Sequence, residues 1–340
     1  MAYHQLRIAK IVQETADARS YVFEVPADLA EKFRYRAGQF LTFRVPHPAG
    51  TFNRCYSLSS APESDGLPKV TVKRVTGGKG SNWFHDALKE GASLEVLPPA
   101  GRFVLSEGTA PLLLFGGGSG ITPMMSLIKS ALQGGTRRMR LFYANRDKPS
   151  IIFDAEFEAL MKAHPGRLEV VHHLDAVQGL TRPEEILAAL KGFEEAEAYL
   201  CGPGPFMTLV ETTLLAAGMP RERVRIERFE ASGNDAVPME PAAEGDVVPA
   251  EITIHIEGKS HKVPYQKGQT ILVAARAAGL NPLSSCEEGF CASCAAKCIK
   301  GKIMLAKNDI YTADDLANGW ILTCQGHCFG PEVEITYDVV

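Results

Sequence analysis

The sequence predicts a multidomain protein with three parts: a small antiparallel β domain, an α/β domain with a parallel sheet, and a compact α+β domain. Three observations support this. The 340 residues suggest two or three domains at about 150 residues each. Short strand-like runs give way near residue 107 to strands that alternate with helical patterns. A stretch rich in proline and acidic residues then separates residues 250–340 from the rest.

The first region, residues 1–106, predicts a small antiparallel barrel or sandwich. Its strand-like runs at 21–25, 40–45, 69–74 and 93–97 are separated by glycine and proline. The region holds 14 lysines and arginines against 10 acidic residues, a balance of +4, whereas the whole chain carries −4. This part of the chain therefore suits an anionic ligand.

The second region, residues 107–229, predicts a parallel sheet with helices on both faces, because apolar strands alternate there with longer helical patterns. We expect strands at 112–115, 139–144, 168–173, 198–201 and 224–226, and helices at 123–132, 155–164, 183–190 and 205–217.

Residues 230–249 lack apolar periodicity and predict an exposed linker. Residues 250–340 follow with strand patterns at 251–256 and 333–337 and a helical pattern at 270–278. This length and mixture predict a third, compact α+β domain.

The composition excludes several classes of protein. With 45% hydrophobic and 22% charged residues, the chain is neither disordered nor fibrous. A net charge of −4 leaves no basic excess for nucleic acid. No run approaches the ~18 apolar residues of a membrane-spanning helix, and the first residues do not resemble a secretion signal. We expect a cytoplasmic protein with neither nucleic acid nor membrane as partner.

The strongest chemical signal is the spacing of four cysteines. Cys286, Cys291 and Cys294 are separated by four and two residues, and Cys324 follows after another 29. This is the plant-type pattern of a [2Fe-2S] cluster. Zinc is the alternative, but zinc sites usually repeat a two-cysteine hook, which the second half of this pattern lacks. Two further cysteines are expected to pack without a role, and one histidine to lie at the surface: Cys298, Cys328 and His327.

Two motifs in the first region suit a ligand with a phosphate and a flat ring. Arg54-Cys55-Tyr56-Ser57 follows a strand and offers a guanidinium, an aromatic ring and a hydroxyl. Residues 73–83, KRVTGGKGSNW, join a strand to a helix expected from Asn82, and their glycines let backbone amides face a phosphate. Either motif alone also fits a surface arginine or an ordinary turn.

Three motifs end strands of the second region, where open α/β sheets bind ligands. Residues 116–123, GGGSGITP, follow the first strand and open a helix, and residues 201–207, CGPGPFM, follow the fourth. After the second strand, Arg146 could pair with a 2′-phosphate, whereas Asp147 could bond a bare ribose hydroxyl. Cys201 has no evident acid-base partner, so we expect it to make contacts rather than act as a nucleophile.

Residues 1–230 together resemble the ferredoxin-NADP reductase family, in which an FAD-binding barrel precedes a nicotinamide-binding domain. Residues 250–340 resemble a plant-type ferredoxin domain of β-grasp fold, whose cluster ligands correspond to Cys286, Cys291, Cys294 and Cys324. One departure is Ala292, where such ferredoxins often have glycine. A methyl group there is expected to crowd a backbone amide close to the cluster.

The resemblance implies residues for each cofactor. For FAD it implies Arg54, Cys55, Tyr56, Ser57, Lys73, Arg74, Val75, Gly78, Gly80 and Ser81, with Phe229 and Glu230 near the flavin. For the nicotinamide cofactor it implies Gly118, Gly120, Thr122, Pro123, Asn145, Arg146, Cys201, Gly202 and Pro203. Ser57, Thr122 and Cys201 are the expected catalytic residues, because hydride transfer requires the two rings to be held against each other.

The domain order resembles reductase components of bacterial oxygenases, most closely the 3-ketosteroid 9α-hydroxylase type, and then phenylacetyl-CoA epoxidase. This implies electron flow from NADH, with NADPH possible, through FAD and the [2Fe-2S] cluster to a terminal oxygenase. The alternatives are the reductase of the epoxidase or of another aromatic or alkyl oxygenase, and a non-catalytic redox-sensing or electron-storage protein.

Overall fold

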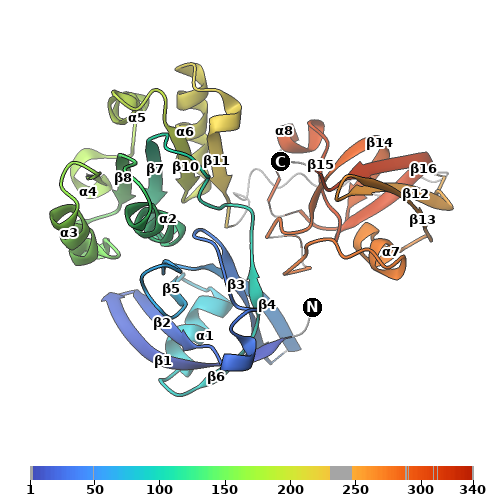
Figure 1. Cartoon of the computed structure of the whole chain (residues 1–340), viewed down its shortest axis with the longest axis horizontal. Coiled ribbons are helices and arrows are strands. Elements are labelled where there is room, and N and C mark those ends of the chain that lie inside the picture. Colours follow the sequence, from blue (N-terminus) through green and yellow to red (C-terminus); the bar gives the residue numbers. More distant parts are fainter. Residues whose placement is uncertain are drawn as a thin grey trace. The chain divides into compact units, whose positions relative to one another are not determined.

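The computed structural model describes residues 3–48, 50–229, 247–287, 289, 291–308, 310–311 and 313–338. The chain divides into an N-terminal unit, Met1–Arg228, and a C-terminal unit, Phe229–Val340. Figure 1 shows two sheets in the N-terminal unit and one in the C-terminal unit.

The first sheet is antiparallel and barrel-like, as the first region predicts. Its order is β4-β3-β6-β1-β2-β5, and a bridge between Leu58 and Val70 joins the segment after β4 to β5. The interior is aromatic: Tyr21, Phe43 and Phe84 are fully buried, the last supplied by helix α1 (Lys79–Ala87). The strands are β1 (His4–Thr15), β2 (Ala18–Glu24), β3 (Phe40–His47), β4 (Gly50–Ser57), β5 (Lys69–Lys73) and β6 (Ser93–Ala100).

Three local features of this sheet differ from expectation. The expected strands do not include β1 and β4, because most residues of these two strands are exposed or only partly buried and do not form apolar runs. The Arg54–Ser57 motif consequently forms the second half of β4 itself rather than following a strand. Helix α1 begins at Lys79 and not at Asn82, since the extended Gly78 caps it.

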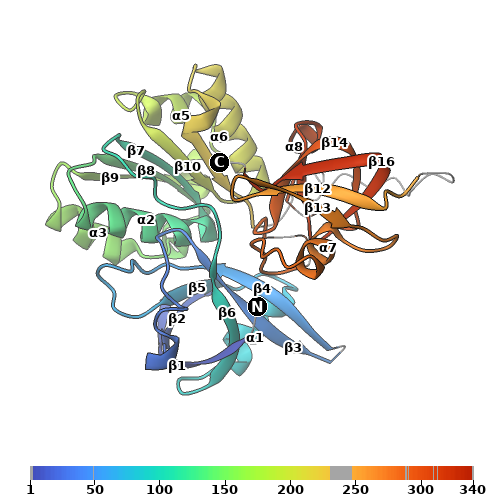
Figure 2. The ribbon, with the colours of Figure 1, turned by 45° about the vertical axis from the view of Figure 1, so that its right-hand side comes forward.

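The second sheet is fully parallel, with the order β11-β10-β7-β8-β9. Figure 2 shows α2 and α3 below the sheet and α5 and α6 above it, so both faces are covered as predicted. All nine expected strands and helices are present: β7 (Leu112–Gly117), β8 (Met139–Asn145), β9 (Leu168–Leu174), β10 (Glu197–Cys201), β11 (Val224–Glu227), α2 (Ile121–Gln133), α3 (Asp154–Ala163), α5 (Pro183–Leu190) and α6 (Gly204–Ala216), together with a short α4 (Asp175–Gln178).

The strand order places a topological switch point between β7 and β10. The chain leaves β7 toward β8 and returns later to β10 on the other side of β7. Loops that leave two such strands diverge, and the crevice between them is where open α/β sheets bind ligands. The GGGSGITP and CGPGPFM motifs follow these two strands.

The C-terminal unit is a mixed sheet with order β13-β12-β16-β14-β15. Helix α7 buries Ile271, Leu272 and Ala275 in the same core as Ile252 and Ile335, which confirms the α+β prediction. The elements are β12 (Glu251–Ile256), β13 (Lys259–Pro264), α7 (Ile271–Ala277), β14 (Ala295–Leu305), α8 (Ala313–Ala317), β15 (Trp320–Leu322) and β16 (Gly326–Thr336).

The last residues of the expected linker pack within the C-terminal unit, against its sheet. The carbonyl of Val247 accepts a hydrogen bond from the amide of Gly330 at 2.7 Å, and Val248 packs against the core. Residues 230–246 of the expected linker lie outside the described residues, so its bounds remain a prediction. Within the described part of the chain, no helix is long and apolar enough to cross a membrane.

Candidate active site and cluster site

Arg54 and Tyr56 project from β4 over the first turn of α1. A Cβ on Gly80 would lie 2.8 Å from Arg54 Cγ and 3.2 Å from the Tyr56 hydroxyl oxygen, so glycine is what allows this close approach. The Tyr56 ring stands edge-on to Phe84 with centroids 4.9 Å apart. A fixed ring and a guanidinium beside a helix N-terminus fit a flavin with its pyrophosphate. The Sγ of Cys55 instead lies 3.1 Å from Thr42 Oγ1 on β3.

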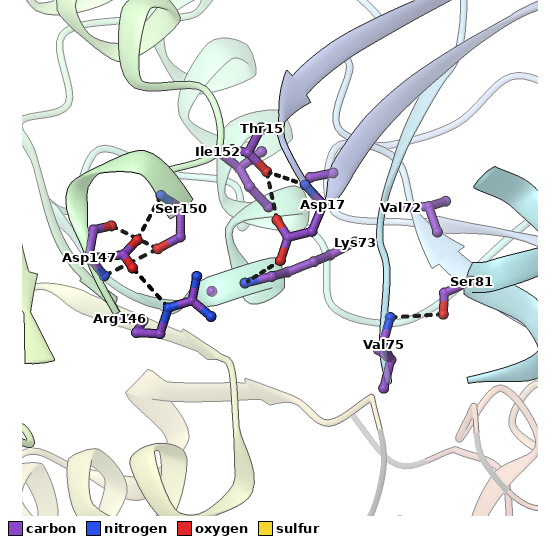
Figure 3. Close-up of polar contacts among 12 residues, drawn as sticks. Thr15, Asp17, Val72, Lys73, Val75, Ser81, Arg146, Asp147, Ser150 and Ile152 are labelled. Carbon is purple, nitrogen blue, oxygen red and sulfur yellow. Dashed lines mark hydrogen bonds and ion pairs between the residues drawn. The ribbon is translucent and has the colours of Figure 1, made fainter. Parts of the chain in front are cut away.

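The second barrel motif orders the start of α1. Ser81 Oγ accepts a hydrogen bond from the Val75 amide at 3.1 Å, as Figure 3 shows, and a Cβ on Gly78 would lie 2.7 Å from that oxygen. Arg74 is paired with Asp86, at 2.7 Å between Nη2 and Oδ1. The structure therefore places Gly78 and Ser81 in the turn, whereas Arg74 binds along the exposed side of α1.

The two glycine motifs of the parallel sheet meet at the switch point. A Cβ on Gly120 would lie 2.1 Å from the carbonyl oxygen of Cys201, and one on Gly117 would lie 2.7 Å from Pro203 Cδ. A Cβ on Gly202 would lie 3.0 Å from Gly117 Cα. The backbones after β7 and β10 are thus in direct contact, which only glycine permits.

Thr122 and Pro123 belong to the buried first turn of α2. Thr122 Oγ1 donates to the carbonyl of Ser119 at 3.1 Å, which fixes the hydroxyl within the glycine turn. Gly118 has φ of +50°, a left-handed conformation that favours glycine. The start of α2 is therefore a rigid, glycine-lined N-terminus suited to a pyrophosphate.

Ser57, Cys201 and Glu227 bring the barrel and the parallel sheet together. Ser57 Oγ donates to Glu227 Oε2 at 3.1 Å, and Glu227 is the register partner of Cys201 at the ends of β11 and β10. Burial raises the pKa of Glu227 to about 8, although the hydrogen bond from Ser57 opposes this. Burial, and then the charge of Glu227, raise the pKa of the Cys201 thiol. A neutral thiol agrees with a contact role.

Glu227 is the functional candidate that sequence reasoning missed. The expected strand 224–226 stops one residue short of it, and the family resemblance pointed instead to Phe229 and Glu230. Phe229 is partly exposed, and Glu230 lies outside the described residues. An acidic residue at the carboxyl end of a parallel strand, level with Cys201 on the neighbouring strand, was the available signal.

The end of β8 carries the expected nucleotide residues. Asn145 is 4% exposed, and neither its amide nitrogen nor its amide oxygen has a hydrogen-bond partner among the described residues. A buried amide without a partner is costly and fits a site that a ligand completes. Asp147 accepts hydrogen bonds from the Ser150 amide at 3.1 Å and from Arg146 Nε at 2.9 Å, as Figure 3 shows.

The four pattern cysteines lie in the C-terminal unit as two contacting pairs. The amide of Cys286 donates to Cys291 Sγ at 3.4 Å, and the side chains of Cys294 and Cys324 lie close enough to interact with each other. All four are free of disulfides. Across the described residues, no three histidine, cysteine or acidic side chains converge on one metal ion. Two pairs of soft thiol ligands fit a two-iron cluster, in which each iron takes two cysteines.

The loop around these cysteines uses left-handed backbone. Gly289 has φ of +81°, and Ala292 has φ of +53°. The alanine therefore occupies a conformation that glycine adopts at lower cost, which explains why glycine is common at this place in similar ferredoxins. Gln325 Nε2 lies 3.7 Å from Cys324 Sγ, so a side-chain amide can donate to one ligand sulfur.

The three residues outside the cysteine pattern have structural contacts. Cys328 is 1% exposed in the core, and Cys298 Sγ lies 3.5 Å from the Lys300 carbonyl oxygen. His327 was expected at the surface, but it is half-buried, with Nδ1 3.0 Å from the carbonyl oxygen of Gln269. Pairing within the sheet accounts for this difference, because His327 belongs to β16.

Comparisons with known proteins agree with this arrangement. Residues 5–105 match an oxidoreductase FAD-binding domain, residues 114–212 an oxidoreductase NAD-binding domain, and residues 254–328 a 2Fe-2S iron-sulfur cluster binding domain. The last match contains all four pattern cysteines and favours the iron-sulfur cluster over zinc.

Relatives align along nearly the whole chain. The ferredoxin reductase component of 3-ketosteroid-9-alpha-monooxygenase from Rhodococcus rhodochrous is 44% identical, covering 98% of this chain and 96% of its own. One component of the 1,2-phenylacetyl-CoA epoxidase from Escherichia coli is 31% identical, covering 99% and 98%. The structure of phthalate dioxygenase reductase is similar, with 25% identity, a TM-score of 0.59 and 98% of both chains covered. The chain therefore belongs to the family of reductase components that use NADH, FAD and a [2Fe-2S] cluster to supply electrons to an oxygenase.

Proposed function

We propose that this chain is the reductase component of a 3-ketosteroid 9α-hydroxylase. The observation that carries this proposal is the higher identity, from end to end, to reductases named for that oxygenase than to the epoxidase component. The epoxidase remains the second candidate on the weaker similarity. We place the protein in the cytoplasm, where reducing conditions keep cysteines out of disulfides, in agreement with the eight cysteines of this chain, none of which is in a disulfide.

In this proposal, residues 1–106 hold FAD. Arg54 and the amides at the start of α1, around Gly78, Gly80 and Ser81, receive the pyrophosphate, and Tyr56 lies against the flat ring system. FAD, when bound, supplies the conversion between a donor of two electrons and a carrier of one. Arg74 and Val75 support the turn through their contacts with α1, and Cys55 supports β4 through its contact with Thr42 on β3.

Residues 107–229 hold NADH at the switch point. The turn containing Gly118 and Gly120 receives the pyrophosphate, and Asn145 supplies the buried amide for the nucleoside end. Thr122, Pro123, Gly202 and Pro203 form the rigid wall where the two glycine motifs meet. Cys201 contributes a neutral, buried thiol to that wall.

Ser57 and Glu227 act as a neutral pair beside Cys201. Because burial raises the pKa of Glu227 to about 8, its carboxyl holds a proton at pH 7, and the Ser57 hydroxyl is directed to Oε2. An uncharged pair at this place avoids a fixed negative charge next to a hydride path.

In the C-terminal unit, residues 250–340 hold the cluster on Cys286, Cys291, Cys294 and Cys324.

The test combines a redox titration with a comparison of acceptors. Under anaerobic conditions, NADH should bleach both flavin and iron-sulfur absorption. The reduced protein should then be tested as electron donor to two oxygenase components. The kcat/KM for the reductase should be at least tenfold higher with a ketosteroid 9α-hydroxylase component than with a phenylacetyl-CoA epoxidase component. A higher kcat/KM with the epoxidase would replace the first candidate by the second. Failure of NADH to bleach either chromophore would overturn the assigned electron path.

A further inference from the structure

The turn between β1 and β2 brings an acidic residue of the barrel to the proposed NADH site. Asp17 Oδ1 accepts a hydrogen bond from Thr15 Oγ1 at 2.7 Å, and its carbonyl accepts from the Arg74 amide at 2.6 Å. These contacts hold the carboxylate so that Oδ2 lies 3.8 Å from Lys73 Nζ. The carboxylate is therefore fixed by its own turn and by the end of β5.

Lys73 connects this carboxylate to the glycine turn of the parallel sheet. Its Nζ lies 3.9 Å from the position that a Cβ on Gly118 would occupy. Gly118 is also held from the other side, because the Tyr143 hydroxyl donates to its carbonyl at 3.3 Å. The ammonium group is thus beside the backbone proposed to receive the pyrophosphate, and Asp17 is its partner there.

Arg146 faces the same place from the end of β8. Figure 3 shows the tips of Lys73 and Arg146 directed toward one another. Asp17 forms an ion pair with Lys73, and Asp147 forms one with Arg146. The pKa of Arg146 is raised mainly by its hydrogen bond and attraction to Asp147, and also by the charge of Asp17. Asp17 therefore acts electrostatically on both cations.

We propose that Asp17 is a specificity-determining residue that favours NADH over NADPH. The inference rests on the NADH site proposed above and deepens it. NADH and NADPH share the pyrophosphate but differ in the 2′-phosphate, which carries between one and two negative charges near pH 7. The carboxylates of Asp17 and Asp147 offset the positive charges of Lys73 and Arg146. The site therefore provides no excess positive charge for the additional phosphate.

The position of Asp17 distinguishes it from Asp147. Asp147 is adjacent to Arg146 and also caps the short η3 helix (Lys148–Ser150), so its replacement would disturb the loop. Asp17 comes from the barrel and can be changed without affecting that cap. An asparagine at position 17 keeps an oxygen for the Thr15 hydroxyl while it removes the charge, which makes Asp17→Asn the informative variant.

The experiment compares Asp17→Asn with the wild type and with Asp28→Asn. Asp28 lies on the exposed η1 turn (Ala27–Leu29) of the same barrel and makes the matched control for net charge. Flavin reduction by NADH and NADPH is followed under anaerobic conditions at low salt. The ratio of kcat/KM for NADPH to that for NADH should rise about three- to tenfold in Asp17→Asn and stay unchanged in Asp28→Asn. The rise should shrink at high salt.

Two further measurements separate charge from structure. In Asp17→Asn combined with Arg146→Gln, the gain for NADPH should disappear, because the cation that would hold the 2′-phosphate is gone. Calorimetry with 2′,5′-ADP and 5′-AMP should show that Asp17→Asn strengthens only 2′,5′-ADP binding. An unchanged NADPH-to-NADH ratio in Asp17→Asn, or an equal gain for both probes, would overturn the inference. If NADH failed to reduce the wild-type flavin, the proposed function itself would fail.

Discussion

At the residue scale, the most informative group is the carboxyl of Glu227. It accepts a hydrogen bond from Ser57 and pairs in register with Cys201, so three elements contribute to one small polar site. An ionised carboxylate at a position largely enclosed by protein loses solvation, and this raises its pKa. The single hydrogen bond from Ser57 only partly offsets that loss, which leaves the acid neutral near pH 7.

The raised pKa of Glu227 predicts a pH dependence of stability. Between its usual value of 4.5 and about 8, the folded protein keeps a proton that the unfolded chain releases. The free energy of unfolding should therefore fall as pH rises through this window, and level off above pH 8. Glu227→Gln should remove about 1 to 3 kcal/mol of this fall between pH 6 and 8.5, measured by urea unfolding of the FAD-loaded protein.

The control for this prediction is Glu222→Gln, an exposed residue of the η4 turn (Arg221–Arg223). It should retain the wild-type dependence on pH. If Glu227→Gln and the wild type lost stability in parallel over the whole range, Glu227 would be ionised in the folded protein, and the neutral pair with Ser57 would be wrong.

At the element scale, the strands of the parallel sheet were predictable from the sequence, but two strands of the barrel were not. Residues 112–115 form an unbroken apolar run because both faces of β7 are covered, and all six residues of β7 are buried. β4 has only one buried residue, Ser57, so no apolar pattern marks it. The motif carried by β4 was recognised, whereas the strand itself was missed.

The contact between α2 and β10 gives a prediction at this scale. Gly120→Ala would place a methyl group 2.1 Å from the Cys201 carbonyl oxygen, and two backbones must separate to accept it. Because displacements of about 1 Å can cost 100-fold in rate, the kcat/KM for NADH should fall between 10- and 100-fold. FAD content should stay normal, since the barrel is unchanged. Stopped-flow flavin reduction measures the kcat/KM for NADH, and the absorbance of the purified protein measures its FAD content.

Gly134→Ala at the opposite end of α2 is the matched control. Gly134 has an ordinary φ of −105°, and the nearest atom to its added Cβ would be the Ser130 carbonyl oxygen at 3.9 Å. This variant should reduce flavin at the wild-type rate. Equal rates in Gly120→Ala and Gly134→Ala would show that the approach of α2 to β10 does not position NADH.

At the scale of the whole molecule, the order of the three regions was predictable from local pattern and agrees with the three family matches, and the four cysteines proposed as cluster ligands follow from spacing alone. The site between β4, β5 and the parallel sheet depends on folding. Asp17 and Glu227 belong to no sequence motif. Their candidate roles follow only from the folded structure, in which Asp17 pairs with Lys73 and Glu227 accepts a hydrogen bond from Ser57. Asp17 and Lys73 are separated by 56 positions in the chain, and Ser57 and Glu227 by 170. Contacts between residues so far apart leave no local sequence signal.

The division into two units predicts that the two cofactor chemistries can be separated by one substitution. Cys291→Ser replaces a soft thiolate by a poor iron ligand in the C-terminal unit, while every residue assigned to FAD and NADH except Phe229 and Glu230 lies in the N-terminal unit. The variant should lose the iron-sulfur absorption. Its rate of electron transfer to a one-electron protein acceptor should fall by about tenfold or more. Its flavin should still be reduced by NADH within about twofold of the wild-type rate.

Cys298→Ser tests whether this effect belongs to the ligand position or to any cysteine of the unit. Cys298 is half-buried, and its Sγ contacts the carbonyls of Lys300 and Gly301 at 3.5 and 3.6 Å, which a hydroxyl can also do. This control should keep both the cluster and the transfer of single electrons. If Cys291→Ser also abolished flavin reduction by NADH, the cluster would be required before the flavin, and the order NADH, FAD, cluster and oxygenase would be contradicted.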